Sequence, residues 1–236
     1  MLDKSRIISL IDLTSLNDAD DAHVIETLCK KAMTPFGKVA AVCLFSPFVK
    51  LAKALVAGEH IPVATVANFP SGKTDLKATL TEIELALADG ADEIDVVMPY
   101  QDYLAGNKKS TQLLVRSCKQ LCNDKTLKVI LETGALSEDT IIYDASCRIL
   151  EAGADFIKTS TGKIAVGATI EAATQMLHAI RQVNPDAGFK ASGGIRTPEQ
   201  AQVYIDLARE IMGETWCNAS HLRIGASSLL DVLIKE

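Results

Sequence analysis

The feature that most constrains this fold is the regular alternation of short apolar segments with longer amphipathic segments. Each short run precedes a segment whose apolar residues have helical spacing. We expect strands over residues 11–14, 39–44, 63–67, 93–98, 127–132, 154–159, 188–191 and 222–225. Alternating strands and helices form parallel sheets, and eight such units in 236 residues predict closure into a barrel. The expected fold class is α/β, a single (β/α)8 TIM barrel with a short N-terminal helix.

The expected helix boundaries carry ordinary capping signals. Asn17-Asp18 precedes one helix, and Thr197-Pro198 combines a capping threonine with a proline in the first turn. Helices are expected over about 1–9, 19–33, 46–58, 75–89, 108–123, 138–151 and 169–183, then from 197 and after 227. The competing open sheet would need a GxGxxG turn after its first strand to bind a dinucleotide, and this sequence has none. We therefore expect one barrel domain over residues 1–236.

Charge and composition exclude several classes of partner. A net charge of −6 argues against nucleic acid or an anionic membrane as the main partner. No stretch approaches the roughly 20 apolar residues of a membrane helix, and no secretory signal is present, so we expect a cytoplasmic protein. The 6 cysteines lack CxxC spacing and are expected to be reduced thiols. The 4 histidines lie far apart without ligand spacing, so we expect no metal site.

Strand alternation predicts charged side chains inside the barrel. Successive side chains of a strand point to opposite faces, so the apolar residues of each strand can face the helices. Four ionisable groups then point inward from the first, fourth, sixth and seventh strands, namely Asp12, Asp95, Lys158 and Lys190. Because active sites of such barrels lie at the C-terminal ends of the strands, these four residues are candidates for catalysis.

Two interpretations of this cluster are open. In the first, two salt bridges stabilise barrel closure, although buried ion pairs stabilise less than apolar packing. In the second, one lysine forms a Schiff base, which requires an amine whose pKa lies far below the ordinary 10.4. A dry site and a second cation both lower that pKa. Phe156 makes the surroundings of Lys158 the driest of the candidate lysines, so we expect Lys158 to be the nucleophile and Asp95 to move protons.

Three small-residue loops follow the sixth, seventh and eighth strands. Glycines let backbone N–H groups approach an anion, and helix N-termini favour negative charge. Barrels often bind phosphate at the loops after strands seven and eight. A single glycine often marks only a turn, but three such loops with nearby basic residues favour a phosphate site. Its candidate residues are Gly162, Lys163, Gly193, Gly194, Arg196, Gly225, Ser227 and Ser228.

Other conspicuous residues are expected to be structural. Glu132 ends the fifth strand and is equally suited to the site, paired with an interior lysine, or to the scaffold. Cys43 is expected in the core. Trp216 is expected to pack in a connecting segment, and the Lys108-Lys109 pair is expected to face solvent.

With these motifs in combination, the chain resembles the deoxyribose-phosphate aldolase family. The matching segments are, in order, IDLTSLND, NFPSG, GADEIDVVMPY, LKVILETG, GADFIKTSTGK, GFKASGGIRT and RIGASSLL, and they extend over almost the whole chain. That family consists of class I aldolases on (β/α)8 barrels. The resemblance implies reversible cleavage of 2-deoxy-D-ribose 5-phosphate to D-glyceraldehyde 3-phosphate and acetaldehyde, within deoxyribonucleotide catabolism.

The resemblance also implies residue roles. Lys158 would form the Schiff base, and Lys190 would lower the pKa of Lys158. Asp95 would relay protons, and Asp12 would be a supporting aspartate of the site. The eight loop residues named above would contact phosphate. No cofactor is implied. One departure is visible, because some members carry a C-terminal tail ending in tyrosine that assists proton transfer, and this sequence ends at residues 233–236 without one.

The expected partner is a small phosphosugar, with no nucleic acid and no membrane. The sequence leaves the oligomeric state open, with a homodimer as one candidate. Two alternative functions also remain: another Schiff-base phosphosugar aldolase, and a non-catalytic phosphosugar-binding barrel.

Overall fold

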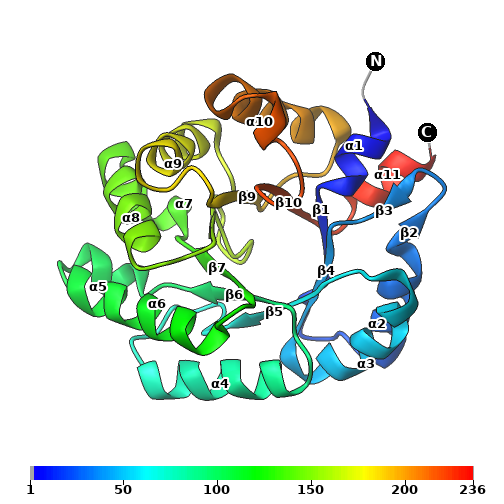
Figure 1. Cartoon of the computed structure of the whole chain (residues 1–236), viewed down its shortest axis with the longest axis horizontal. Coiled ribbons are helices and arrows are strands. Elements are labelled where there is room, and N and C mark those ends of the chain that lie inside the picture. The colour runs from blue at the N-terminus through cyan, green and yellow to red at the C-terminus, as the bar shows by residue number, and fades with distance from the viewer. Residues whose placement is uncertain (1–2, 236) are drawn as a thin grey trace.

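The computed structural model, which describes residues 3–235, is a closed parallel barrel surrounded by helices (Figure 1). Its strands pair in the order β1, β4, β5, β6, β7, β8, β9 and β10, and β10 pairs with β1 to close the ring. The strand bounds are β1 Ile11–Thr14, β4 Ala41–Leu44, β5 Val63–Ala67, β6 Glu93–Val97, β7 Thr126–Ile130, β8 Phe156–Lys158, β9 Gly188–Ser192 and β10 Leu222–Ala226. The predicted (β/α)8 fold class is confirmed.

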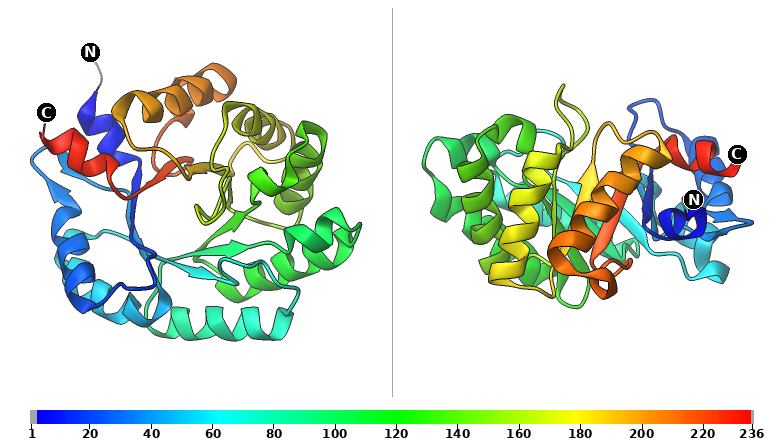
Figure 2. Two further views of the ribbon diagram at one scale, coloured as in Figure 1. Left: turned by 180° about the vertical axis from the view of Figure 1, so that it is seen from behind. Right: turned by 90° about the horizontal axis from the view of Figure 1, so that it is seen from above.

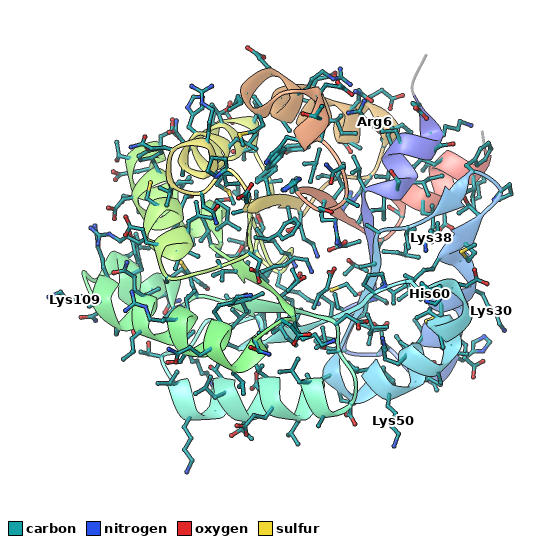
Figure 3. The ribbon with its side chains drawn as sticks, in the orientation of Figure 1. Arg6, Lys30, Lys38, Lys50, His60 and Lys109 are labelled. Atoms are coloured by element: carbon teal, nitrogen blue, oxygen red, sulfur yellow. The ribbon has the colours of Figure 1, made fainter. Side chains whose placement is uncertain are left out.

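The helices cover the outside of this ring. Their bounds are α1 Lys4–Ser9, α2 Ala22–Lys31, α3 Val49–Val56, α4 Leu76–Ala88, α5 Tyr100–Leu104, α6 Lys108–Cys122, α7 Thr133–Leu136, α8 Asp139–Glu151, α9 Ile170–Val183, α10 Pro198–Met212 and α11 Leu229–Lys235. Short 3-10 turns occupy Ser46–Phe48, Ala57–Glu59 and Glu214–Trp216. Lys30, Lys50 and Lys109 point outward from this ring (Figure 3), as expected for cations on a solvated surface.

The main hydrophobic core lies between the strands and the helices. In β6 and the residue after it, Ile94, Val96 and Met98 are fully buried in that core. Glu93 and Asp95, which alternate with them, point the other way, into the barrel, where both contact the ammonium group of Lys128. Alternation therefore separates an apolar outer layer from a charged interior, as the sequence predicted.

Several local boundaries differ from the sequence prediction. Residues 33–38, expected as a helix end and loop, form a hairpin of β2 Met33–Thr34 and β3 Gly37–Lys38. Asp21, rather than Asn17-Asp18, caps α2 through a hydrogen bond from the backbone N–H of Val24. The short helices α5 and α7 were not predicted, and the first two residues of the expected helix 1–9 lie outside the described residues.

The loops at the C-terminal ends of the strands gather on one side of the barrel. The side view in Figure 2 shows the segment between β8 and α9, in yellow-green, rising above that end. Among residues 3–235, no helix has the length and apolar character needed to cross a bilayer.

Candidate active site

Four inward-pointing side chains meet inside the barrel, as alternation predicted. The Nζ atoms of Lys158 and Lys190 each lie 2.8 Å from Oδ2 of Asp95. Lys190 also lies 2.5 Å from Oδ2 of Asp12. Adjacent strands bring them together, since β8 and β9 pair Lys158 with Lys190 in register.

Three further charged residues complete this cluster, and the sequence interpretation did not name them among its site candidates. Lys128 donates to Glu93 and, at 2.9 Å, to Oδ1 of Asp95. Arg223 donates to Asp12 at 2.7 Å and to Glu93 at 2.9 Å. The same alternation, applied to β7, β10 and the start of β6, would have found all three.

These groups form one interior ion network, and they are Asp12, Glu93, Asp95, Lys128, Lys158, Lys190 and Arg223.

The two strand lysines have pKa values shifted in opposite directions. Burial lowers the pKa of Lys158, and the neighbouring charge of Lys190 lowers it further against the opposing effect of Asp95. Burial also acts to lower the pKa of Lys190, but Asp12 and Asp95 outweigh it and raise that pKa. Lys190 therefore stays an ammonium ion while the amine of Lys158 is biased toward its neutral form.

The reason given for choosing Lys158 from the sequence was wrong in one respect. Lys190 is 0% exposed and Lys158 is 3% exposed, so Lys158 is not in the driest setting. What separates the two lysines is their partners, because Lys190 contacts two carboxylates and Lys158 contacts one. Lys158 is also the one that borders an open cavity.

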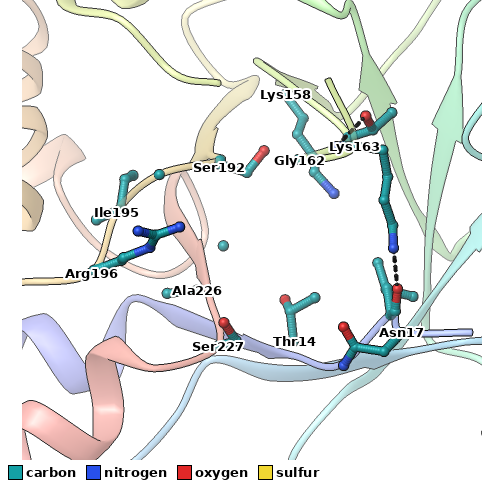
Figure 4. A pocket seen from close by; sticks show the side chains of 15 residues that line it. Thr14, Asn17, Lys158, Gly162, Lys163, Ser192, Ile195, Arg196, Ala226 and Ser227 are labelled. Atoms are coloured by element: carbon teal, nitrogen blue, oxygen red, sulfur yellow. Dashed lines mark hydrogen bonds between the residues drawn. The ribbon is translucent and has the colours of Figure 1, made fainter. Parts of the chain in front are cut away.

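That cavity has a volume of about 250 Å³ and opens at the C-terminal end of the barrel. Figure 4 shows Lys158 pointing into it, with Arg196 and Ser227 across from it. Lys163 borders it too, and its Nζ donates to the carbonyl of Leu16 at 2.6 Å. Of the eight predicted phosphate residues, seven line the cavity: Gly162, Lys163, Gly193, Gly194, Arg196, Gly225 and Ser227. The eighth, Ser228, is absent from the lining and is exposed just before α11.

Two of the loops are in backbone contact. A Cβ built on Gly193 would lie 2.9 Å from Cα of Gly167, so no side chain fits there. The N–H of Ala168 donates to the carbonyl of Gly193 at 3.1 Å. Gly193 and Gly194 have φ values of 90° and 87°, which L side chains rarely adopt. The loop after β9 therefore presents bare backbone to the cavity.

Glu132 does not line the cavity but bonds Thr161, which does, and it has no lysine partner among the described residues. It follows β7 with φ 57° and ψ 58° and is fully buried. Its carboxylate accepts the backbone N–H of Thr161 at 3.2 Å and the Thr161 hydroxyl at 2.5 Å. The suggested ion pair with an interior lysine is not found among the described residues.

The remaining structural expectations can be located. Cys43 is fully buried in a small apolar cluster inside the barrel with Leu16, Ala64 and Val66, and Phe45 and Phe69 pack against it. Trp216 packs in the core and donates to the carbonyl of Pro185 at 2.9 Å. Lys108 bonds Asp144 at 2.8 Å, while Lys109 is exposed.

This arrangement suits addition of an amine to a carbonyl compound. Lys158 presents a depressed-pKa amine to a cavity, and a permanent cation stands beside it. Backbone N–H groups, Lys163 and Arg196 surround the other side of the cavity, as an anionic ligand would require.

Comparison with known proteins gives one family. The model of the DeoC/LacD family aldolases matches residues 6–235. A candidate deoxyribose-phosphate aldolase of Toxoplasma gondii ME49 superposes with a TM-score of 0.89 at 25% identity, over 99% of this chain and 92% of that one. The deoxyribose phosphate aldolase of Aeropyrum pernix, described as tetrameric, gives 0.80 at 26% identity, over 98% and 90%. An aldolase named QR15 gives 0.83 at 28% identity, over 97% and 96%.

Proposed function

Because this chain belongs to the DeoC/LacD family of aldolases and is a carbon–carbon lyase, we propose that it cleaves 2-deoxy-D-ribose 5-phosphate reversibly. The products are D-glyceraldehyde 3-phosphate and acetaldehyde, and the intermediate is a Schiff base on Lys158. The reaction belongs to the breakdown of deoxyribonucleotides. The observation that carries this proposal is the amine of Lys158, whose pKa burial and Lys190 lower, at the edge of a cavity lined by anion-binding groups.

The chemistry begins with attack of the neutral Lys158 amine on C1 of the open-chain sugar. Loss of water gives an iminium ion, which draws the C2–C3 bonding electrons when that bond breaks. Asp95 lies 2.8 Å from Nζ of Lys158 and is placed to move protons at that nitrogen and the adjacent carbon. Asp12 holds Lys190 at 2.5 Å and so keeps the second cation in position. Hydrolysis of the protonated enamine releases acetaldehyde.

The phosphate group occupies the far side of the cavity in this proposal. Gly162, Gly193, Gly194 and Gly225 offer backbone, and Lys163 and Arg196 offer charge. Ser227 lies on the same wall, while Ser228, just before α11, is outside the cavity lining.

Borohydride reduction in the presence of deoxyribose 5-phosphate tests the proposal directly. Mass spectrometry of the digested protein is expected to place the reduced adduct, five-carbon if trapped before cleavage and two-carbon if trapped after it, on Lys158. Lys158→Arg keeps the charge but cannot form an imine, so it should lose the adduct and essentially all turnover. A label on Lys190 would reverse the roles of the two lysines, and no label at all would leave a phosphosugar-binding barrel.

Substrate comparison tests the sugar. Deoxyribose 5-phosphate is expected to be cleaved with a higher kcat/KM than other aldose and ketose phosphates. A higher value for a different phosphosugar would assign the enzyme to another Schiff-base aldolase.

We also propose that the protein is a homo-oligomer, with a dimer as the smallest form. The tetrameric description of the Aeropyrum pernix enzyme supports self-association. Sedimentation velocity would show a monomer if this proposal is wrong.

A further inference from the structure

Glu132 is the one carboxylate in residues 3–235 that is fully buried and makes no ion pair. The other buried carboxylates, Asp12, Glu93 and Asp95, each contact at least one lysine or arginine within 4.0 Å. A desolvated carboxylate without a cation is costly. Its left-handed backbone, φ 57° and ψ 58°, adds strain of the kind that gathers at functional sites. Both features call for a role that a simple scaffold residue would not need.

The hydrogen bonds of Glu132 define the direction of the Thr161 hydroxyl. A hydroxyl has one donor and two acceptor positions. When Glu132 is ionised, the Thr161 hydroxyl proton lies toward Oε2 of Glu132, at 2.5 Å, because an ionised carboxylate only accepts. One lone pair of Oγ1 accepts the N–H of Lys163 at 3.0 Å. The second lone pair is free, and Thr161 lines the cavity with Lys158. Thr161 can therefore receive a hydrogen bond from a ligand hydroxyl.

Asp95 is poorly suited to take a proton from a substrate hydroxyl. Its Oδ1 accepts from Lys128 at 2.9 Å, and its Oδ2 accepts from Lys158 and Lys190 at 2.8 Å. Burial alone would raise the pKa of Asp95, but these three lysines outweigh it and hold that pKa well below its ordinary value. Such a carboxylate is too weak a base for a neutral hydroxyl, although it can exchange protons with the more acidic groups formed at the Lys158 nitrogen, 2.8 Å away. Glu132 differs, because burial raises its pKa against the hydrogen bonds from Thr161 and the charge of Lys158.

Charge balance in the barrel is kept when a buried carboxylate, here Glu132, takes up the proton. In the iminium state proposed above, four cations stand near four carboxylates: Lys128, Lys190, Arg223 and the iminium on residue 158, against Asp12, Glu93, Asp95 and Glu132. Bond cleavage converts the iminium to a neutral enamine. If Glu132 takes up a proton in the same step, three cations remain near three carboxylates. The buried charges stay balanced throughout, which avoids an uncompensated charge in a low-dielectric interior.

We propose that Thr161 accepts the proton of the substrate C3 hydroxyl as the C2–C3 bond breaks, while Thr161 passes its own proton to Glu132. This inference rests on the proposed function. The oxygen lone pair left on C3 forms the new aldehyde carbonyl. The C2–C3 bonding pair becomes the enamine double bond, and the iminium nitrogen takes up the displaced π electrons. No oxidant or further reactant is needed. In the synthetic direction, protonated Glu132 returns the proton through Thr161 to the new C3 oxygen.

Two reactions of the same active site separate this relay from the Schiff-base chemistry. Exchange of the acetaldehyde methyl protons with D2O needs the imine and enamine on Lys158 but no C3 hydroxyl. Cleavage of deoxyribose 5-phosphate needs the Lys158 intermediates and also removal of the C3 hydroxyl proton. Glu132→Gln, which is nearly isosteric, should lower kcat for cleavage by about 100-fold or more, the usual contribution of a general base. The same variant should exchange acetaldehyde protons, and form the borohydride-trapped adduct, at close to the wild-type rate.

Matched variants define the relay further. Thr161→Val should behave like Glu132→Gln, and the double variant should be no slower than either single variant, because the two residues act as a unit. Thr161→Ser keeps the hydroxyl and should retain cleavage, whereas Asp95→Asn should lose cleavage and exchange together.

The possible outcomes are distinct. If Glu132→Gln loses exchange and cleavage in parallel, or keeps both, the relay is wrong and Glu132 only supports the loop. If the wild-type protein neither traps acetaldehyde nor exchanges its protons, the Schiff-base proposal itself fails.

Discussion

At the scale of single residues, the chemistry of Lys158 depends on which charges its neighbours carry. Lys158 and Lys190 contact the same carboxylate oxygen of Asp95, and the Nζ atom of each is 2.8 Å from that oxygen. A positive charge held this close disfavours a second one, so Lys190 acts on Lys158 without touching a substrate. The raised pKa of Lys190 keeps its charge in place across the neutral range.

Lys190→Leu should shift adduct formation to higher pH. Removing the neighbouring cation raises the pKa of Lys158, so its neutral amine appears only in more alkaline solution. The measurement is the fraction of protein trapped by borohydride with acetaldehyde as a function of pH. Lys163→Leu is the control, because Lys163 borders the same cavity but bonds the Leu16 carbonyl. An unchanged or lower midpoint for Lys190→Leu would contradict the assigned role.

Lys128→Met should destabilise the protein strongly, since it leaves Glu93 and Asp95 short of a cation in a dry interior. Breaking a buried pair costs about 3–5 kcal/mol. Adding Glu93→Gln should restore most of the free energy of unfolding, because the cluster then regains its balance.

Urea unfolding measures these losses. The control is Lys53→Met, whose partner Asp92 lies at 2.8 Å in a pair with side-chain exposures of 36% and 29%. Removing such a partly exposed pair should cost less than about 1 kcal/mol. Equal losses for Lys53→Met and Lys128→Met would show that burial of the network does not matter.

Much of this site could be predicted from alternation along the strands. Asp12, Asp95, Lys158 and Lys190 were expected inside the barrel, and the structure brings them together. The local sequence could not show how many partners each lysine has, because those partners come from other strands. For that reason exposure was the wrong criterion for choosing between Lys158 and Lys190.

At the scale of elements, the long strands and helices were predictable and the shortest elements were not. A two-residue strand such as β2 or β3 is too short to show alternation. Its hairpin depends on Thr34, whose hydroxyl donates to the Gly37 carbonyl at 2.7 Å. The four-residue helix α7 begins after the left-handed backbone of Glu132. That conformation is set by contacts with Thr161, far along the sequence.

Gly194→Ala tests the loop after β9 as the phosphate-binding element. The built Cβ meets nothing within 4 Å, so the change adds backbone strain at φ 87° and a methyl group beside the cavity. KM for deoxyribose 5-phosphate should rise far more than KM for unphosphorylated deoxyribose.

Gly213→Ala is the matched control for this loop. Gly213 has φ 94°, its built Cβ also meets nothing within 4 Å, and it ends α10 outside the cavity lining. The Gly213→Ala variant should carry similar backbone strain without changing KM for deoxyribose 5-phosphate or for deoxyribose. Equal effects of Gly194→Ala on the two sugars would remove this loop from the phosphate site.

At the scale of the whole molecule, the interior ion network makes stability depend on pH. Burial would raise the pKa values of Asp12 and Asp95, but their cationic partners outweigh it and lower both. A carboxylate with a lowered folded pKa stabilises the protein above its unfolded value of about 3.8, and that contribution is lost as the pH falls toward the folded value. Urea midpoints should therefore fall steeply below about pH 4.

Glu132 contributes to the pH dependence of stability with the opposite sign. Its pKa is raised, so its contribution is fully present below the unfolded value of 4.5 and is lost as the pH rises through the folded value. Glu132→Gln should be relatively more stable at neutral pH than at pH 4 when each is compared with the wild type. A constant difference between the two proteins across this range would show that Glu132 is not desolvated.

The same buried charges affect how the stability of this barrel depends on temperature. The penalty for removing ions from water falls as temperature rises, because ion hydration becomes less favourable. Hydrophobic stabilisation weakens on cooling. In a barrel filled with Val, Ile and Leu, cooling only weakens hydrophobic stabilisation. In this barrel, cooling also increases the penalty for burying the charged groups. Its temperature of maximum stability should therefore lie above that of an apolar-filled barrel of the same size.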